Sequence, residues 1–274
     1  MQQILSIISG LLPACGLEIR ECEHAEFLDC TVSATSMRIL FGVGPGPSVV
    51  ATCVLPAPPV PDEALAAVTA RFQAWVPHAR LQLRRAPGGA TVAFFDDAHA
   101  FDPAGPPLTA AWLRGSVQAL ELAARAVGIF GEKLNGTEGL ISTYSADDAR
   151  RHTALKAILQ AHEFSFVEEA RVLGGPAVVI NDEVRMRIMV RGGTLLFHVA
   201  SPFDAPYDVR AGFAAAVHSR LPFGRVLIGP PDAKAIVVEY PHRVGADLTE
   251  FDVLHGFSAM TVLSEAMSNL AGGA

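Results

Sequence analysis

The sequence contains no tract of basic residues. Its 21 Lys and Arg are outnumbered by 28 Asp and Glu, which gives a net charge of −7. The acidic excess is shared evenly, because residues 1–140 carry 9 basic and 13 acidic side chains and residues 141–274 carry 12 and 15. Binding to a phosphate backbone relies on clustered positive charge. We therefore expect no nucleic acid partner.

A recognisable catalytic motif is also absent from the sequence. None of the nine histidines forms an HExxH or HxH spacing, and no Gly-x-Ser-x-Gly, Walker or kinase signature occurs. The densest polar cluster is Asp96, Asp97, His99 and Asp102, which a solvated loop explains more simply than a metal site. The sequence thus predicts a protein that is not an enzyme and has no catalytic residues, metal or cofactor.

Long apolar runs are missing as well. No segment approaches the roughly 18–20 apolar residues of a membrane span. The apolar stretch at residues 4–12 is preceded by Met1, Gln2 and Gln3, which supply none of the positive charge that an export signal carries. We expect residues 4–12 to form a helix, and we expect a cytoplasmic protein without a membrane partner.

The most informative feature that is present is a weak internal repeat. Residues 60–95 align with residues 205–240 without a gap, and seven of the 36 positions are identical. The identical pairs are Pro61/Pro206, Ala66/Ala211, Ala70/Ala215, Pro77/Pro222, Arg80/Arg225, Ala90/Ala235 and Val92/Val237. The flanking elements recur in the same order, which is typical of two copies of one fold. We expect domains at residues 1–131 and 146–274, joined by a linker at 132–145.

Cysteine is confined to the first copy. The four residues are Cys15, Cys22, Cys30 and Cys53, and their spacings include no CxxC pair or zinc pattern. Because the second copy has none, disulfides are not a requirement of the fold. We expect buried thiols that act as small apolar side chains.

Each copy is expected to have an α+β fold with the element order α-β-β-β-α-β-β-α. The third strand alternates apolar and polar side chains at residues 36–41 and again at 185–190. After a turn rich in Gly, the chain returns as an extended segment, at residues 49–55 in the first copy and 195–200 in the second. Middle helices are expected at 62–75 and 208–220, before strand pairs at 80–83 with 91–95 and 225–228 with 236–240. Thr109 and Thr249 suit the N-cap of a last helix.

Four arginines recur at matching places in the two copies. The alignment pairs Arg38 with Arg187 and Arg80 with Arg225, each alternating with apolar residues of a strand. On a sheet face they either form ion pairs within the protein or receive carboxylates from a partner, since the guanidinium group suits two-point pairing. Both interpretations stay open.

Several strands are apolar on both faces, notably 91–95 and 236–240. Met189, Leu196 and Leu227 are expected on the same face as the arginines. Strands of this kind are usually covered on both sides, and helices of one copy cover only one side. We expect the second cover to be the sister copy, a second chain or a client protein, which makes the sheet an association surface.

The order of elements and the apolar pattern resemble the YbjN-like family and, more broadly, the type III secretion chaperone-like fold. The resemblance is clearest at residues 222–226, in the short hairpin at Gly192 and Gly193, and at residues 245–249. It is looser in the first copy, whose hairpin at residues 42–47 is longer. The resemblance implies small antiparallel sheets with helices on one face, pairing of copies as in a dimer, and a bacterial protein that binds other proteins or has a regulatory role.

The leading hypothesis is a non-catalytic protein or peptide binder, chaperone-like or regulatory, that uses the sheet and groove surfaces of two tandem copies. Arg38, Arg80, Arg187 and Arg225 are its candidate polar anchors, with Met189, Leu196 and Leu227 as apolar contacts. The alternatives are a structural module that self-associates and an enzyme with a site between the copies. His99 or His242 beside carboxylates in a polar cleft would favour the enzyme.

Overall fold

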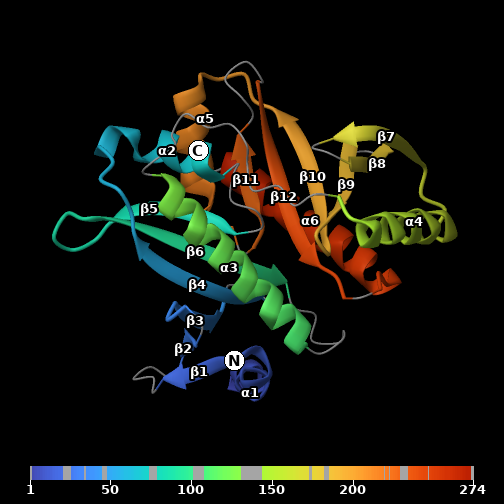
Figure 1. Ribbon diagram of the computed structural model, residues 1–274. Helices are drawn as coiled ribbons and strands as arrows, with labels where there is room; N and C mark the ends of the chain where they lie inside the picture. The colour runs from blue at the N-terminus through green and yellow to red at the C-terminus, as the bar shows by residue number, and fades with distance from the viewer. Residues whose placement is uncertain are drawn as a thin grey trace. The chain divides into compact units, whose positions relative to one another are not determined.

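A computed structural model of the 274-residue chain shows an α+β protein (Figure 1). The chain divides into two compact units, Met1–Leu140 and Ile141–Ala274. The structure describes residues 2–20, 26–33, 35–44, 48–73, 79–100, 108–130, 144–172, 175–181, 185–218, 220–221, 223–228, 234–245 and 247–272. The predicted linker at 132–145 lies outside these residues except for Tyr144 and Ser145.

Unit 1 contains one six-stranded sheet with the order β1-β2-β3-β4-β6-β5, in which all neighbours are antiparallel. Its helices are α1 (Gln2–Leu11), α2 (Leu65–Gln73) and α3 (Ala110–Phe130), with short 3-10 turns at Pro13–Cys15 and Asp62–Ala64. Its strands are β1 (Leu17–Arg20), β2 (Phe27–Val32), β3 (Arg38–Val43), β4 (Ser48–Pro56), β5 (Arg80–Arg85) and β6 (Thr91–Ala100).

Unit 2 repeats this plan with the strand order β11-β12-β10-β9-β8-β7. Its helices are α4 (Ala146–Ala161), α5 (Tyr207–His218) and α6 (Glu250–Gly272). Its strands are β7 (Phe166–Val172), β8 (Gly175–Asn181), β9 (Arg185–Arg191), β10 (Thr194–Pro202), β11 (Arg225–Ile228) and β12 (Ala235–Arg243). Two tandem copies of one α+β plan, as predicted, are confirmed.

The predicted order α-β-β-β-α-β-β-α is wrong by one strand, because four strands precede each middle helix. The return segments are complete strands. β4 pairs with both β3 and β6, and β10 pairs with both β9 and β12. In unit 2 the turn before the return strand contains Gly192 and Gly193 at positive φ, which suits a tight hairpin.

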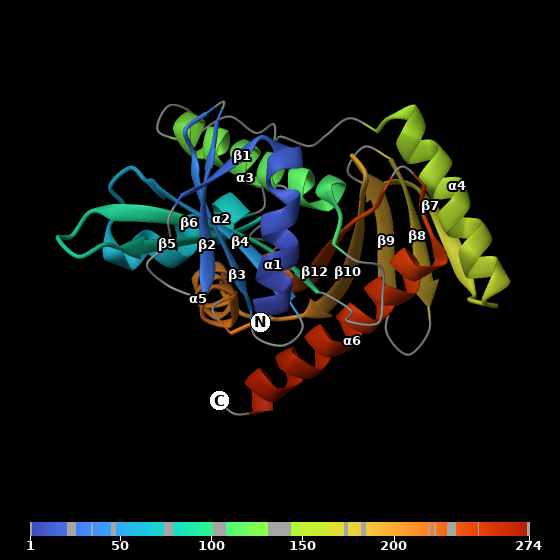
Figure 2. The same cartoon turned by 90° about the horizontal axis from the view of Figure 1, so that it is seen from below.

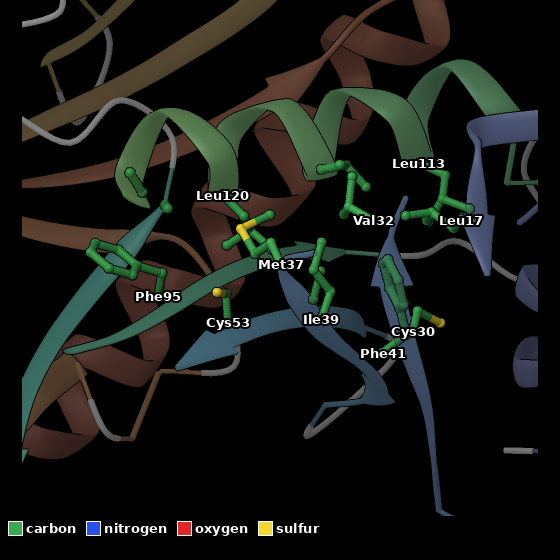
Figure 3. Packing of buried hydrophobic residues seen from close by; sticks show 14 of the residues in the cluster. Leu17, Cys30, Val32, Met37, Ile39, Phe41, Cys53, Phe95, Leu113 and Leu120 are labelled. Carbon is green, nitrogen blue, oxygen red and sulfur yellow. The ribbon is translucent and has the colours of Figure 1, made fainter. Parts of the chain in front are cut away.

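The core of unit 1 lies between one face of the sheet and all three helices. Ile8, Phe72 and Leu120 come from α1, α2 and α3, and the strands contribute Ile39 and Phe41 among others. Figure 3 shows this packing, with Leu113 and Leu120 of α3 above the sheet. Helices on a single face of the sheet are therefore observed, as predicted.

The described cysteines of this unit are free thiols. Cys30 and Cys53 are buried within the core, and Cys15 is half-buried. Burial raises the pKa of the Cys53 thiol to about 11. This agrees with their predicted role as small apolar side chains; Cys22 lies outside the described residues.

The core of unit 2 includes a cluster of aromatic rings. Phe197 of β10 contacts Phe257 of α6 with ring centroids 6.0 Å apart, and Phe257 stacks on Phe164 at 4.8 Å. Helix α6 approaches the sheet closely at Gly256, where an added Cβ atom would collide with the Phe197 ring. Helices α4 and α6 contact the strands and each other (Figure 2). The face of the sheet that carries Phe197 is thus the helix-covered face.

Across the part of the chain that the structure describes, we find no helix with the length and apolar character needed to cross a membrane. The predicted N-terminal helix is present as α1.

Candidate functional site

Two of the predicted site residues, Arg187 and Arg225, lie in a row of polar side chains that crosses four strands of unit 2. Arg225 pairs across the ladder with Glu239, Glu239 with His198, and His198 with Arg187. Cross-strand partners point to the same side of a sheet. Phe197 faces α6, so its neighbour His198 and the whole row lie on the face opposite the helices.

Most of this row is buried and internally paired. Glu239 is only 2% exposed and forms hydrogen bonds with both Arg225 and His198, which are also buried. Burial by itself raises the pKa of the Glu239 carboxyl, but the charges of Arg225 and His198 outweigh it and hold the pKa far below its usual range. Arg225 is thus engaged with an internal carboxylate.

Unit 1 has a related row at the corresponding place. Arg80 pairs across the ladder with Asp96, Asp96 with Thr52, and Thr52 with Leu40. The Thr52 hydroxyl donates to Asp96 over 2.7 Å. Burial lowers the pKa of Arg80, while the charges of Asp96 and Asp97 oppose that shift. The predicted match between Arg80 and Arg225 holds, because each is buried opposite an acid.

The predicted match between Arg38 and Arg187 is corrected by the strand registers. Arg187 and Leu40 occupy the same place in the two rows, and Arg38 instead matches Arg185, since these two residues begin β3 and β9. The sequence alignment was offset by two residues here. An offset of two leaves each side chain on the expected face, which is why the prediction of the face was still correct.

A second offset of two residues follows the arginines. The separation from Arg225 to Glu239 is two residues shorter than the separation from Arg80 to Asp96. The hairpin between β11 and β12 is therefore two residues shorter than the hairpin between β5 and β6. Val92 therefore pairs with Arg84, whereas Val237 pairs with Leu227. Val92 and Val237 are identical residues in the gapless alignment, but they do not occupy equivalent positions in the two sheets.

The more exposed arginines also bind carboxylates. Arg38 holds Asp29 through its Nε, 2.8 Å from Oδ1. Arg187 and Arg185 share Glu169 of β7, at 2.8 Å and 2.7 Å. Burial raises the pKa of Glu169, and the two arginines outweigh that effect and lower it. Internal pairing is observed for Arg38 and Arg187.

The three apolar site residues lie on the face that was predicted. Met189 pairs across the ladder with Leu196, and Leu227 lies two residues after Arg225 on β11. Met189 is fully buried, whereas Leu196 and Leu227 are half-buried.

The gapless alignment of residues 60–95 with residues 205–240 places Gln73 opposite His218, and the two side chains have the same structural role. Each is the last residue of its middle helix and binds the backbone of the next strand. The Leu81 amide donates to Oε1 of Gln73 over 2.6 Å, and the Val226 amide donates to Nε2 of His218 over 2.6 Å. Both strands, β5 and β11, lie at an end of their sheet. In each unit, the side chain at the end of the middle helix therefore accepts a hydrogen bond from a backbone amide of an end strand. The polar residue that recurs at this position is the sequence feature that could have predicted this role.

The opposite ends of the two sheets are β1 and β7. Strand β1 has four residues and β7 has seven. Phe166–Glu169 pairs regularly with β8, and an irregularity in register follows between Glu169 and Val172. Val167 lies in this regular part and is 52% exposed. An end strand leaves one side of its backbone without a ladder partner.

Two histidines proposed for an enzyme site do lie beside carboxylates. Nε2 of His99 is 3.3 Å from Asp97, and Nε2 of His242 is 2.9 Å from Asp252. Within the described residues, no three His, Cys, Asp or Glu side chains converge as a metal site. Asp102, the remaining member of the predicted polar cluster, lies outside them.

No family model matches the chain, and no curated protein matches its sequence. Among solved structures, it is similar to the crystal structure of YbjN from E. coli, described as a candidate transcription regulator. The identity is 12% and the TM-score 0.38, over 46% of this chain and 90% of YbjN. The similarity is a distant one at the level of the fold, and it says nothing of the activity or partners of the present chain.

Proposed function

We propose that this protein is a non-catalytic binding protein that takes up an extended segment of a client protein as an additional strand beside β7. The observation that carries the proposal is the difference between the two ends of the unit 2 sheet. Strand β11 has four residues, and His218 occupies the amide of one of them. Strand β7 is longer and exposes Val167.

Strand addition suits this edge physically. The free backbone groups of an end strand supply hydrogen bonds, and alternate side chains supply specificity. Because the register is regular only over Phe166–Glu169, the added segment is short, with about four residues in the ladder. Val167 and Glu169 face one side, and Phe166 and Glu168 face the other.

Among the candidate anchors, Arg187 contacts β7. Its guanidinium group binds Glu169 from two strands away. Arg80 and Arg225 are buried opposite acids and stabilise the sheet itself. The client is therefore recognised by β7 together with the arginines of β9.

A matched pair of substitutions tests the proposal. Val167 and Val209 have nearly equal exposure, 52% and 54%, but Val209 lies on helix α5. Peptides are selected on the wild-type protein from a random library, and their affinities are then measured for Val167→Asp and Val209→Asp.

Val167→Asp is expected to weaken binding about tenfold, because an apolar contact worth about 1.5 kcal/mol is lost. Val209→Asp should leave the affinity unchanged. The proposal is contradicted if no peptide is selected, or if the two variants lose affinity equally.

The same open edge favours a second candidate function, self-association of two copies through β7. Two antiparallel end strands can complete one continuous sheet. Light scattering over a dilution series measures this directly. A dimer that Val167→Asp converts to a monomer, in a protein that selects no peptide, would establish self-association in place of client binding.

A further inference from the structure

We propose that the segment bound by β7 carries a carboxylate two residues before an apolar side chain, so that the edge recognises an acidic motif of the form acid-x-apolar. This inference rests on the proposed function and concerns the chemistry of the partner. It follows from the charges that surround Val167 and Glu169 on the face of the sheet opposite the helices.

Among the described residues, positive charges outnumber negative ones on that face near β7. Glu169 is a single carboxylate that receives Nη2 of Arg185 at 2.7 Å and both Nε and Nη2 of Arg187, at 3.0 Å and 2.8 Å. The side chains of Arg185 and Arg187 are 65% and 32% exposed. Two guanidinium groups paired with one carboxylate leave a net charge of one positive. Each guanidinium group has five N–H donors, so the pairing with Glu169 does not use all of them.

The helix-covered face of β7 shows no such excess. Glu168 there accepts from Nζ of Lys156 over 3.0 Å and contacts His152, also at 3.0 Å. One lysine there balances one carboxylate. The preference for an acidic client residue therefore belongs to the side chains that share a face with Val167 and Glu169.

The spacing of the motif follows from antiparallel pairing, which every ladder of unit 2 uses. A client residue opposite Val167 places the residue two positions earlier opposite Glu169. The apolar client side chain then meets Val167, and the acidic one lies beside the Glu169 carboxylate, where the net positive charge of the two arginines attracts it. The residue between them points to the other face.

Two synthetic peptides that differ only in Asp or Asn, two residues before a valine, test the inference. Their affinities are measured by fluorescence anisotropy at low and high salt for wild type, Arg185→Gln and Arg185→Lys. Arg150→Gln is the control, because Arg150 is a 77% exposed arginine of the same unit that also pairs with an aspartate, Asp147.

The Asp peptide should bind wild type about two- to fivefold more tightly than the Asn peptide, as expected for an exposed ion pair. High salt and Arg185→Gln should abolish that difference, while Arg185→Lys and Arg150→Gln should retain it. If wild type binds both peptides equally, or if Arg185→Gln weakens both equally, the acidic motif is wrong while strand addition stands. If neither peptide binds, in a protein that also selects none from the library, the proposed function itself fails.

Discussion

The two units have the same six-stranded plan, but they differ at the free ends of their sheets. Both place a buried arginine opposite an acid, and both use the last side chain of the middle helix to bind the next strand. Among the described residues, unit 2 ends in a seven-residue strand with an exposed valine, whereas β1 of unit 1 has four residues. The arginine–acid pairs and the bonds from the middle helices recur in both units, and they stabilise the fold. The long end strand β7 does not recur, and we propose that it is the binding site.

The rows of polar side chains across the two sheets also differ between the units. From Arg80 the row in unit 1 continues through Asp96 to Thr52 and Leu40, so that its charge ends after two residues. From Arg225 the row in unit 2 continues through Glu239 and His198 to Arg187, whose partner Glu169 belongs to β7. Among the described residues, the polar row of unit 2 therefore continues to an arginine that binds the end strand β7, whereas the row of unit 1 ends in Leu40.

The largest expected effect separates the two arginine–acid pairs. Glu239→Gln should lower the free energy of unfolding by about 3–5 kcal/mol, because it leaves Arg225 and its charge buried without their carboxylate. Asp96→Asn should cost about 1–2 kcal/mol, because Asp96 is half-buried and also bonded to Thr52.

Urea unfolding can follow each unit separately. Both tryptophans, Trp75 and Trp112, belong to unit 1, and all three tyrosines, Tyr144, Tyr207 and Tyr240, belong to unit 2. Tryptophan and tyrosine fluorescence therefore report on different units. Equal losses for the two variants would mean that the pairs do not differ in burial as described.

A smaller effect tests the equivalence of Gln73 and His218. His218→Ala should cost about 1–3 kcal/mol, because the buried Val226 amide loses its acceptor. His218→Gln should recover most of this loss, since glutamine already binds the equivalent amide in unit 1. If His218→Gln is as unstable as His218→Ala, the two helix ends are not interchangeable.

The smallest effect concerns pH. The pKa of Glu239 is lowered in the folded protein from an ordinary value of 4.5, so its contribution to stability is complete above that pH and is lost as the pH falls towards the folded value. One such carboxyl contributes a loss of about 1 kcal/mol between about pH 4.5 and about pH 3.5. The tyrosine signal should show this loss, and Glu239→Gln should flatten the curve by that amount. An unchanged slope in the variant would remove Glu239 from the explanation.

Much of the fold was predictable because the pattern of apolar residues is periodic. Alternation at Ile39 and Phe41, and at Ile188 and Val190, identified the buried face of the third strands, and those residues are buried. Registers were harder. Arg38 and Arg187 were paired through a similar local sequence, and only hydrogen bonding between strands reveals an offset that preserves the alternation.

The candidate site was less predictable. Burial of Arg80 and Arg225 depends on neighbours distant in sequence, Asp96 and Glu239, which the gapless alignment did not bring into register. The open edge at β7 is a property of strand order. The local sequence around Val167 does not predict that β7 is the end strand of the sheet.

Hydrogen exchange of the backbone amides, measured with and without a selected peptide, tests strand addition most directly. We expect added protection among residues 166–169 of β7, at alternate amides, and unchanged exchange in β1, β5 and β11. Protection at one of those other end strands, or bound peptide without any change in β7, would contradict the account.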